Sequence, residues 1–384
     1  MSAVSKRLTQ QTDALDVLVS GGSMGGLFTG IALEDAGHDV TIYEQSTGEL
    51  RSRGGGIVAQ RNIREFLGEH DVVDPSEVTT SSSERRFLTR DGDVERVAPD
   101  SMVFTSWDAV YRQLRDAFPA DQYRTGREVV DVAPATASAE FADGTERTAD
   151  LVVAAEGGQS STRQELFPEA TPEFADYAAW RGLVPETDLP AEVASEFDDT
   201  FTFYQGPNFL ILAYLIPGPE GGVAPGERRL NWVWYDGLQK RDRTAIFTDV
   251  DGVQQQFSIP PGQLREPIRD RQVERAGAVL PPIFTTVVEA TPDPFVQAIY
   301  DLRVPEMTAD RACLLGDAAF VARPHTAAGT SKAAGDAVEL AAALDRHDEV
   351  DAALTAWDES RATYGSRLVA QGKRMGDERL DLAP

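Results

Sequence analysis

Residues 15–26 read LDVLVSGGSMGG, an apolar run that passes directly into a glycine-rich turn. The run predicts a buried strand over 15–19, and the residues after the turn predict a helix over 24–36. A second predicted strand over 40–43 ends at Glu44, which completes a β-α-β unit of about thirty residues. Such a unit indicates an α/β fold with a parallel sheet.

The glycine-rich turn predicts a dinucleotide-binding site. A strand that turns sharply into a helix leaves unpaired backbone N–H groups at the positive end of the helix dipole, where a pyrophosphate binds. Gly21 and Gly26 occupy the first and third glycine positions of the fingerprint, and Ser23 occupies the second. Glu44 is placed to accept hydrogen bonds from a ribose diol. The fingerprint alone does not distinguish NAD from FAD, and a structural glycine turn is the alternative.

The bulk composition fits a globular chain of about two domains. The chain has 384 residues, of which 41% are apolar, and this is enough for a sizeable core. No run approaches the ~20 apolar residues of a membrane-spanning helix. The first fourteen residues are polar and resemble a loose tail rather than a signal peptide. The single cysteine, Cys313, cannot form an intramolecular disulfide, so we expect a cytoplasmic protein without a membrane partner.

The charge balance is strongly acidic. The formal net charge is −27 at pH 7, which argues against nucleic acid as a partner because phosphate binding requires a basic face. Only four of the 36 basic residues are lysines: Lys6, Lys240, Lys332 and Lys373. We favour a halophile-like surface, on which high salt screens self-repulsion. An ordinary acidic protein from a GC-rich genome is the alternative.

Two later segments carry further motifs. Residues 150–163, DLVVAAEGGQSSTR, follow an apolar strand with Glu156-Gly157, Ser160 and Arg163. Residues 312–337 read ACLLGDAAFVARPHTAAGTSKAAGDA, in which the notable positions are Gly316-Asp317, Pro324, Ala327-Ala328-Gly329 and Asp336-Ala337. Both segments resemble motifs of the p-hydroxybenzoate hydroxylase family, the single-component (group A) flavin monooxygenases. The three motifs occur in the order and at the spacing of that family, and the resemblance covers essentially the whole chain.

Four shorter runs resemble a dihydroxypyridine-hydroxylating group within this family. They are GGGIVAQ (54–60), WRG (180–182), LNWVWY (230–235) and ARPHTAAGTSKA (322–333). In the wider family an arginine approaches the flavin from the position that Tyr111 occupies here, and the tyrosine also matches this group.

The resemblance implies a fold, a cofactor and a reaction. The expected fold is an FAD-binding Rossmann-like α/β domain with an inserted, mainly antiparallel substrate-domain sheet (an α+β insert). The expected enzyme binds FAD, uses NADPH or NADH as a transient co-substrate, and forms a flavin C4a-hydroperoxide with O₂ that hydroxylates a small electron-rich aromatic or heteroaromatic substrate. The predicted domains are a discontinuous FAD-binding domain (14–75, 101–175 and 291–345), a substrate-binding domain (76–100 and 176–290) and a C-terminal helix (346–384).

The motifs nominate the residues that contact the cofactor. The predicted FAD contacts are Gly21, Gly22, Ser23, Met24, Gly26, Glu44, Gln45, Arg53, Gln60, Tyr111, Asp317, Pro324, Ala327, Ala328, Gly329, Thr330 and Ser331, and the second motif adds Glu156, Gly157 and Arg163 for NAD(P)H or FAD. Asp317, at the end of a core strand, is placed to accept a hydrogen bond from the ribitol chain. Residues 327–331 open a helix whose positive end would stabilise a reduced, anionic flavin.

Two residues are candidates for contact with the substrate. His325 follows Pro324 beside the flavin turn, and an imidazole suits proton transfer near neutral pH. Its alternative is a loop histidine that caps a carbonyl. Tyr214 lies on the strand-like run FLILAYLIP, where a core tyrosine is the alternative. Trp232 and Trp234 alternate with Val233, so they share one face of a strand, either as a pocket wall or as core.

Other functions remain as alternatives. A flavin halogenase or a reductase could use the same scaffold, although Trp232-Val233-Trp234 is followed by Tyr235-Asp236 rather than by the Ile-Pro of a halogenase motif. A flavin-binding module without turnover is the alternative from another class. The residues form no recognisable metal-ligand cluster. An apolar stripe over 350–376 permits either a homodimer or packing of that helix on its own domain.

Overall fold

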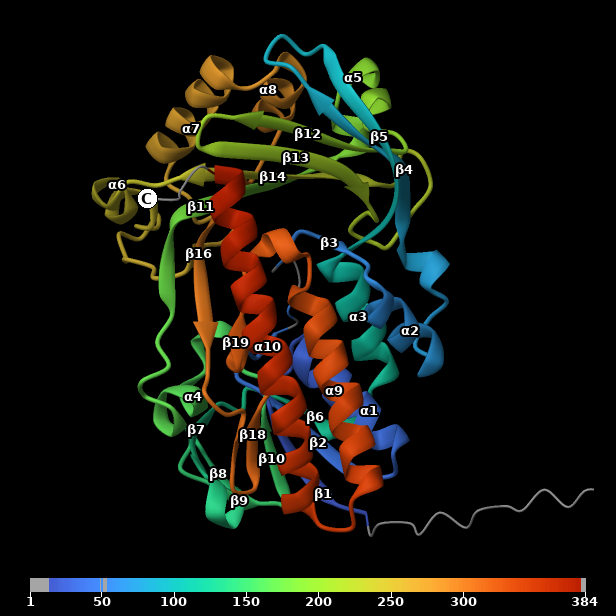
Figure 1. Ribbon diagram of the computed structural model, residues 1–384, viewed down its shortest axis with the longest axis vertical. Helices are drawn as coiled ribbons and strands as arrows, with labels where there is room; N and C mark the ends of the chain where they lie inside the picture. Colours follow the sequence, from blue (N-terminus) through green and yellow to red (C-terminus); the bar gives the residue numbers. More distant parts are fainter. Residues whose placement is uncertain (1–13, 49, 51–53, 381–384) are drawn as a thin grey trace, which may run out of the picture.

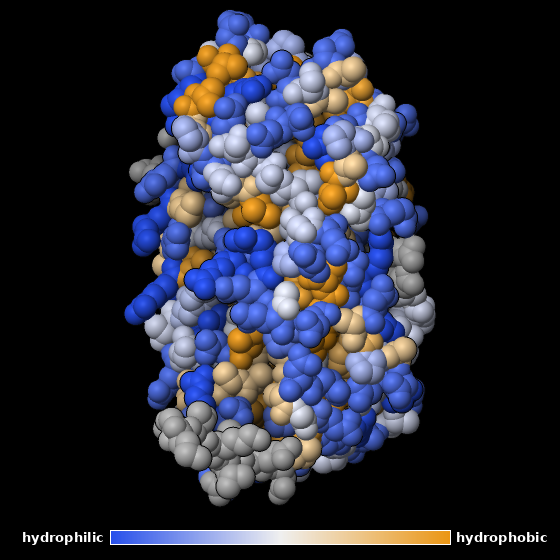
Figure 2. All heavy atoms as spheres, turned by 90° about the vertical axis from the view of Figure 1, so that its right-hand side faces the viewer, coloured by the Kyte–Doolittle hydropathy of each residue, from blue (hydrophilic) through white to orange (hydrophobic). Residues whose placement is uncertain are grey.

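The computed structural model describes residues 14–48, 50 and 54–380. Figure 1 shows an elongated molecule with a parallel sheet and its helices in the lower half and a larger sheet in the upper half. The helix α10 (Val350–Leu380) runs along the long axis and reaches the larger sheet. The side face in Figure 2 is largely hydrophilic, with small separated apolar spots, which fits the acidic composition.

The lower half is built on a sheet that is parallel except for one antiparallel strand pair at its edge, Thr308–Ala309 with Ala312–Leu314. In the described residues the sheet has six strands in the order β17-β18-β10-β1-β2-β6. Their bounds are β17 (Thr308–Ala309), β18 (Ala312–Leu314), β10 (Leu151–Ala154), β1 (Asp16–Ser20), β2 (Asp39–Glu44) and β6 (Tyr123–Thr125). β1 pairs in parallel with β2 and β10, and β10 pairs in parallel with β18. The β-α-β unit and the two later buried strands are therefore confirmed.

Both faces of this sheet are covered. On β1, Val17 and Val19 are buried in a helical core, whereas Leu18 is buried on the opposite face. The helices of the first face are α1 (Met24–Asp35), α2 (Arg61–Glu69), α3 (Trp107–Ala117) and α9 (Gly329–Arg346). The second face carries β7 (Val129–Ala133), β8 (Ser138–Phe141), β9 (Glu146–Thr148) and α4 (Ser161–Leu166). A continuous apolar strand requires this double cover because its side chains alternate between faces.

The upper half is built on a larger, mainly antiparallel sheet. In the described residues its strand order is β15-β16-β11-β14-β13-β12-β4-β5-β3, and β19 pairs with β16. The bounds are β15 (Ser258–Ile259), β16 (Phe295–Arg303), β11 (Glu173–Pro185), β14 (Arg229–Gly237), β13 (Phe209–Ile216), β12 (Thr200–Gly206), β4 (Thr80–Leu88), β5 (Val94–Ser106), β3 (Gly56–Val58) and β19 (Phe320–Val321). Only β12 and β4 pair in parallel among these described strands. β3 and β16 come from ranges assigned above to the FAD-binding domain, whose boundaries stay a prediction.

The two faces of the larger sheet differ in what covers them. Trp232 and Trp234 on β14 are fully buried in a core that four helices share. These helices are α5 (Ala191–Glu196), α6 (Lys240–Ile246), α7 (Glu266–Val279) and α8 (Pro282–Glu289). Val233 and Tyr235 belong to the core of the opposite face. The tryptophans therefore share one face, as predicted, and that face is core. The sequence patterns did not predict these four helices.

α10 joins the two halves. At its lower end Trp357 Nε1 donates to the Asp336 carbonyl at 3.0 Å, and Arg361 Nε donates to the Asp336 carboxylate at 2.7 Å. At its upper end Arg323 Nη1 donates to Asp377 at 2.6 Å. The apolar stripe of α10 thus packs on its own chain and gives no argument for a homodimer. No described helix has both the length and the apolar character that a membrane span requires.

Candidate active site

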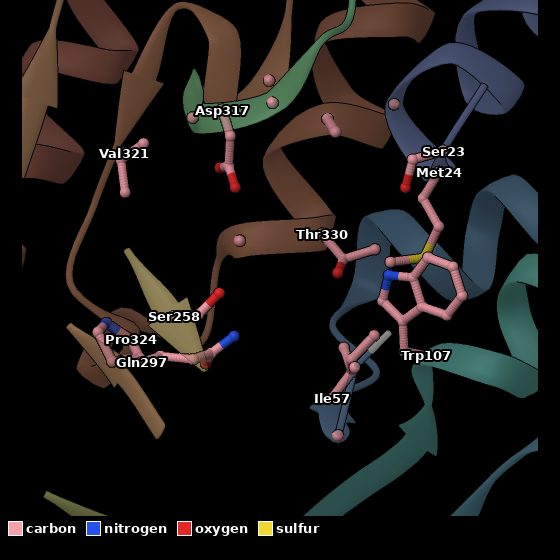
Figure 3. Close-up of a pocket in the computed structure, with 18 of the residues that line it drawn as sticks. Ser23, Met24, Ile57, Trp107, Ser258, Gln297, Asp317, Val321, Pro324 and Thr330 are labelled. Atoms are coloured by element: carbon pink, nitrogen blue, oxygen red, sulfur yellow. The ribbon is translucent and has the colours of Figure 1, made fainter. Parts of the chain in front are cut away.

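Residues of both sheets line a cavity of about 930 Å³. Its lining includes the glycine turn after β1, residues 54–58, the start of α9 and the inner face of the larger sheet. In Figure 3, Met24, Ile57 and Trp107 lie on one side of the cavity near Thr330, Asp317 lies at another edge, and Pro324 lies beside Gln297 and Ser258. All three sequence motifs therefore contribute to one cavity.

The first motif has a backbone geometry that requires glycine. Gly21 has a φ of +102°, and a Cβ on it would lie 2.5 Å from the Ala155 carbonyl oxygen. A Cβ on Gly26 would lie 1.9 Å from the Gly21 carbonyl oxygen. α1 follows Ser23 without a side-chain cap, and Ser23 and Met24 line the cavity. The positive end of α1 is therefore available to an anion such as a pyrophosphate.

Glu44 lies at the end of β2 on the same edge of the cavity. Its Oε2 accepts a hydrogen bond from the Gly22 N–H at 2.9 Å, and its Oε1 accepts one from the Ser46 N–H at 2.8 Å. Glu44 is buried, and both it and Gln45 line the cavity. Because each carboxylate oxygen has two lone pairs, Glu44 keeps acceptor capacity for a ribose diol.

The second motif supports the cavity wall. The Glu156 carboxylate accepts hydrogen bonds from Ser20 Oγ at 2.6 Å, Ser160 Oγ at 2.6 Å and Thr162 Oγ1 at 2.8 Å. Glu156 and Gly157 line the cavity. Arg163 is buried, which lowers the pKa of its guanidinium, and its Nη1 donates to the Ala318 carbonyl at 3.3 Å. Arg163 is therefore not part of the cavity lining, and it hydrogen-bonds to the turn that carries Asp317.

The third motif places a carboxylate on the cavity. The Gly316 N–H donates to the buried Asp336 carboxylate at 3.0 Å, and Gly316 has a φ of +66°. Asp317 lines the cavity, and its Oδ1 lies 2.5 Å from the Nζ of buried Lys332. Lys332 also donates to the Phe320 carbonyl. Asp336 and Lys332 thus hold the turn after β18 in place, and Asp317 remains at the cavity surface.

The flavin turn predicted over 327–331 opens α9. Ala327 adopts a left-handed conformation with a φ of +54°, and α9 begins at Gly329 without a side-chain cap. Pro324, Ala327, Gly329 and Thr330 line the cavity. A second helix N-terminus therefore borders the same cavity, and its dipole favours negative charge there.

Several predicted cofactor contacts are not among the described residues that line the cavity. They are Gly22, Gly26, Gln60, Tyr111, Arg163, Ala328 and Ser331. Some of them support residues that do line it: Tyr111 stacks on Trp107 with ring centroids 4.8 Å apart, and Gln60 Nε2 donates to the Thr326 carbonyl at 3.2 Å. Trp107, which the sequence patterns did not single out, lines the cavity. Arg53 lies outside the described residues.

The part of the cavity below the larger sheet is called the chamber here. It is lined by Phe201, Phe203, Leu212, Tyr214, Val233, Tyr235, His325, Arg85, Arg181 and Arg379. Both predicted substrate contacts, His325 and Tyr214, therefore lie in it. The three arginines and Tyr235 were missed. Arg181 had a signal, because it is the middle residue of the WRG run, whereas Arg85 and Arg379 lie outside the motifs, where an arginine usually faces solvent.

His325 is held as a neutral imidazole. Its Nε2 lies 3.0 Å from Tyr177 Oη, and its ring centroid lies 4.5 Å from that of Tyr235. Nδ1 has no hydrogen-bond partner among the described residues. Burial, with the nearby Arg379 and Arg323, lowers the pKa of His325 to about 3. A neutral imidazole in the chamber can exchange a hydrogen bond with a bound ligand through Nδ1.

Tyr214 differs from His325 because its hydroxyl keeps its proton and acts as a hydrogen-bond donor. Its ring stacks on Phe104 at 4.1 Å between centroids and meets Phe201 edge-on at 5.1 Å. Burial raises the pKa of its hydroxyl, and the nearby Arg181 opposes this. Tyr214 therefore stays protonated at neutral pH and can donate a hydrogen bond but cannot act as a base.

Comparisons with known proteins agree with these motifs. A family model described as FAD binding domain-like matches residues 174–301. The 2,6-dihydroxypyridine 3-monooxygenase of Paenarthrobacter nicotinovorans is 33% identical over 362 residues, which cover 94% of this chain and 90% of that protein. The structure of 2,6-dihydroxypyridine-3-hydroxylase from Arthrobacter nicotinovorans matches with a TM-score of 0.91 and 29% identity, over 97% of this chain and 94% of that one.

A more distant structure shares the fold. Klebsiella pneumoniae HpxO, solved with FAD and uric acid, matches with a TM-score of 0.77 and 20% identity, over 98% of this chain and 91% of that one. Together with the identity and coverage of the dihydroxypyridine monooxygenase, the three motifs of one cavity lead to a single assignment. The chain belongs to the group A FAD-dependent monooxygenases, the p-hydroxybenzoate hydroxylase family.

Proposed function

We propose that this protein hydroxylates an electron-rich aromatic or heteroaromatic substrate, using FAD, NAD(P)H and O₂. The observation that supports this most is the continuity of one cavity, from the two helix N-termini to the aromatic chamber. A substrate in the chamber would lie beside the end of the cavity that His325 and Pro324 share with the start of α9. An oxygen atom could then be transferred without exposure to bulk water.

The described residues fit FAD. The open N-terminus of α1 suits the pyrophosphate, Glu44 suits a ribose diol, Asp317 suits the ribitol chain, and the start of α9 suits the flavin edge that becomes negative on reduction. FAD held by these residues would supply the redox chemistry that couples oxidation of NAD(P)H to reduction of O₂, with one oxygen atom entering the substrate and the other leaving as water.

The side chains of the chamber would act on the substrate itself. Phe201, Phe203 and Val233 exclude water from the ring. His325, neutral at physiological pH, would accept a hydrogen bond from a ring hydroxyl and so make the ring more electron-rich. Tyr214 would donate a hydrogen bond to a ring oxygen or nitrogen.

The test is a substrate-stimulated oxidation screen on the purified yellow protein. NADH and NADPH oxidation and O₂ uptake are followed at low and high salt, with and without hydroxypyridines and phenols. The 2,6-dihydroxypyridine in the name of the relative is the first trial substrate. We expect a trial compound to accelerate flavin reduction and to be hydroxylated. If none is hydroxylated and none changes the rate, the protein is a non-hydroxylating flavoprotein, either a reductase or a flavin-binding module without turnover.

A further inference from the structure

The charged residues that line the cavity are largely sorted by sign, and among the described lining residues Arg127 is the cation that lies at the carboxylate end. Among the described residues that line it, the carboxylates are Glu44, Glu128, Glu156 and Asp317. All four lie on segments next to the parallel sheet. This part of the cavity, which contains the glycine turn after β1, is called the dinucleotide end. The chamber contains Arg85, Arg181 and Arg379 and no described carboxylate. Since His325 is neutral, the chamber carries a net positive charge before any ligand binds.

Arg379 reaches the chamber from the last turn of α10, which is firmly docked. The Arg379 carbonyl accepts a hydrogen bond from Gln205 Nε2 at 2.8 Å, on the hairpin of the larger sheet. Leu380 is fully buried in the aromatic core of that sheet. A Cβ on Gly376 would lie 2.8 Å from Arg323 Nη1, so the helix approaches its neighbour closely. The position of Arg379 is therefore fixed by the fold.

The guanidinium of Arg379 differs from those of its neighbours. Arg323 donates to Asp301 at 3.0 Å and to Asp377 at 2.6 Å, and Arg85 Nε lies 2.5 Å from Asp100. Arg379 makes no side-chain hydrogen bond or ion pair with any described residue.

The groups near Arg379 do not neutralise the positive charge of its guanidinium. The groups that act on it are Tyr235, Arg85, Glu378 and Tyr177, of which only the exposed Glu378 is an acid. Burial, together with the repulsion from Arg85, lowers the pKa of Arg379. A half-buried cation without a partner is stabilised when an anion binds to it.

We propose that Arg379, on the C-terminal helix, binds an anionic substituent of the substrate, and that a ring carboxylate is the group it selects. The inference rests on the proposed function, because it takes the chamber as the substrate site. A carboxylate is ionised at neutral pH and matches the planar fork of a guanidinium. Arg181, whose buried Nε has no partner among the described residues, lies near Tyr235 and adds to the same positive field.

The test measures binding without turnover. The oxidised holoenzyme is titrated, without NAD(P)H, with pairs of hydroxyaromatic acids and their carboxamides, beginning with 6-hydroxynicotinate and 6-hydroxynicotinamide. The readout is the change in flavin absorbance. We expect the wild type to bind the acid more tightly than its carboxamide. Arg379→Gln should raise the Kd of the acid by about tenfold or more and leave that of the carboxamide within about twofold, because a charge-assisted hydrogen bond is lost.

Two variants control for charge and folding. Arg374→Gln removes an exposed arginine of the same helix and should leave both Kd values unchanged. Arg379→Lys keeps the charge and should recover part of the affinity for the acid. If no acid of the panel binds more tightly than its carboxamide, or if Arg374→Gln has the same effect as Arg379→Gln, the proposal is wrong. A panel that binds in the expected order but is never hydroxylated would instead contradict the proposed function.

Discussion

The two ends of the cavity are built differently. At the dinucleotide end the polar groups hydrogen-bond to one another. Glu156 accepts hydrogen bonds from three side chains, and Glu44 and Asp336 accept hydrogen bonds from backbone N–H groups. In the chamber, His325 Nδ1 and Arg181 Nε lack hydrogen-bond partners among the described residues. One end is thus shaped by backbone that only glycine permits, for one fixed ligand. The other end presents unsatisfied side chains, on which the choice of substrate would depend under the proposed function.

We expect the largest effect, a loss of stability, when the buried carboxylate of Asp336 beneath the dinucleotide end of the cavity is removed. Asp336→Ala leaves Arg361 buried without its partner and removes the acceptor of the Gly316 N–H. We expect the free energy of unfolding to fall by about 3–5 kcal/mol, as when a buried ion pair loses one member. Urea unfolding of the holoprotein measures it, with Asp345→Ala, an exposed carboxylate of the same helix, as control. A loss no larger than that of the control would show that this end is not held by side-chain networks.

The next effect concerns FAD affinity. In Gly26→Ala the new Cβ would meet the Gly21 carbonyl oxygen at 1.9 Å, so the turn must shift. We expect FAD to bind roughly tenfold more weakly or worse, since overpacking costs about 1–3 kcal/mol. Flavin fluorescence on dilution measures the dissociation. Gly277→Ala, on a helix where a Cβ meets nothing within 4 Å, is the control, and equal affinity in both variants would overturn the backbone argument.

In the chamber, His325 should make the free energy of unfolding depend on pH. The pKa of His325 is lowered to about 3, so its contribution to stability is complete above the ordinary histidine pKa and is lost as the pH falls toward 3. Between pH 7.5 and 5.5 the wild type should lose about 1.4 kcal/mol more of its free energy of unfolding than His325→Gln does. Denaturant unfolding at the two pH values measures this difference, and His347→Gln should behave as the wild type. Parallel losses in wild type and His325→Gln would mean that His325 is not buried in neutral form.

The smallest effect is expected at Tyr214. Tyr214→Phe keeps the ring that stacks on Phe104 and removes only the hydroxyl, so the free energy of unfolding should hardly change. If the hydroxyl donates to the substrate, kcat/KM should fall roughly 2- to 12-fold, the worth of one neutral hydrogen bond. Steady-state kinetics on the best substrate of the screen provides the test. An unchanged kcat/KM would assign Tyr214 to the core of the chamber wall.

The same contrast explains what the sequence could predict. The dinucleotide end follows from contiguous motifs, because a strand, a glycine turn and a helix occupy adjacent residues. The chamber draws Arg181 from β11, Tyr235 from β14 and Arg379 from α10, and no local pattern indicates that these meet. His325 and Tyr214 were found because one adjoins a motif and the other lies on an apolar run. The helix α8 was missed although it begins at Pro282, where proline at the start of a helix is favourable.

The claim that one cavity serves both cofactor and substrate is tested most directly by isotope transfer. The flavoprotein, NAD(P)H and ¹⁸O₂ are mixed with the aromatic compound that stimulates NAD(P)H oxidation most, and the organic product is analysed by mass spectrometry. We predict one ¹⁸O atom in each product molecule and little H₂O₂. Oxidation that proceeds at the same rate without the aromatic, with all the oxygen recovered as H₂O₂ and no label in the compound, would contradict the account.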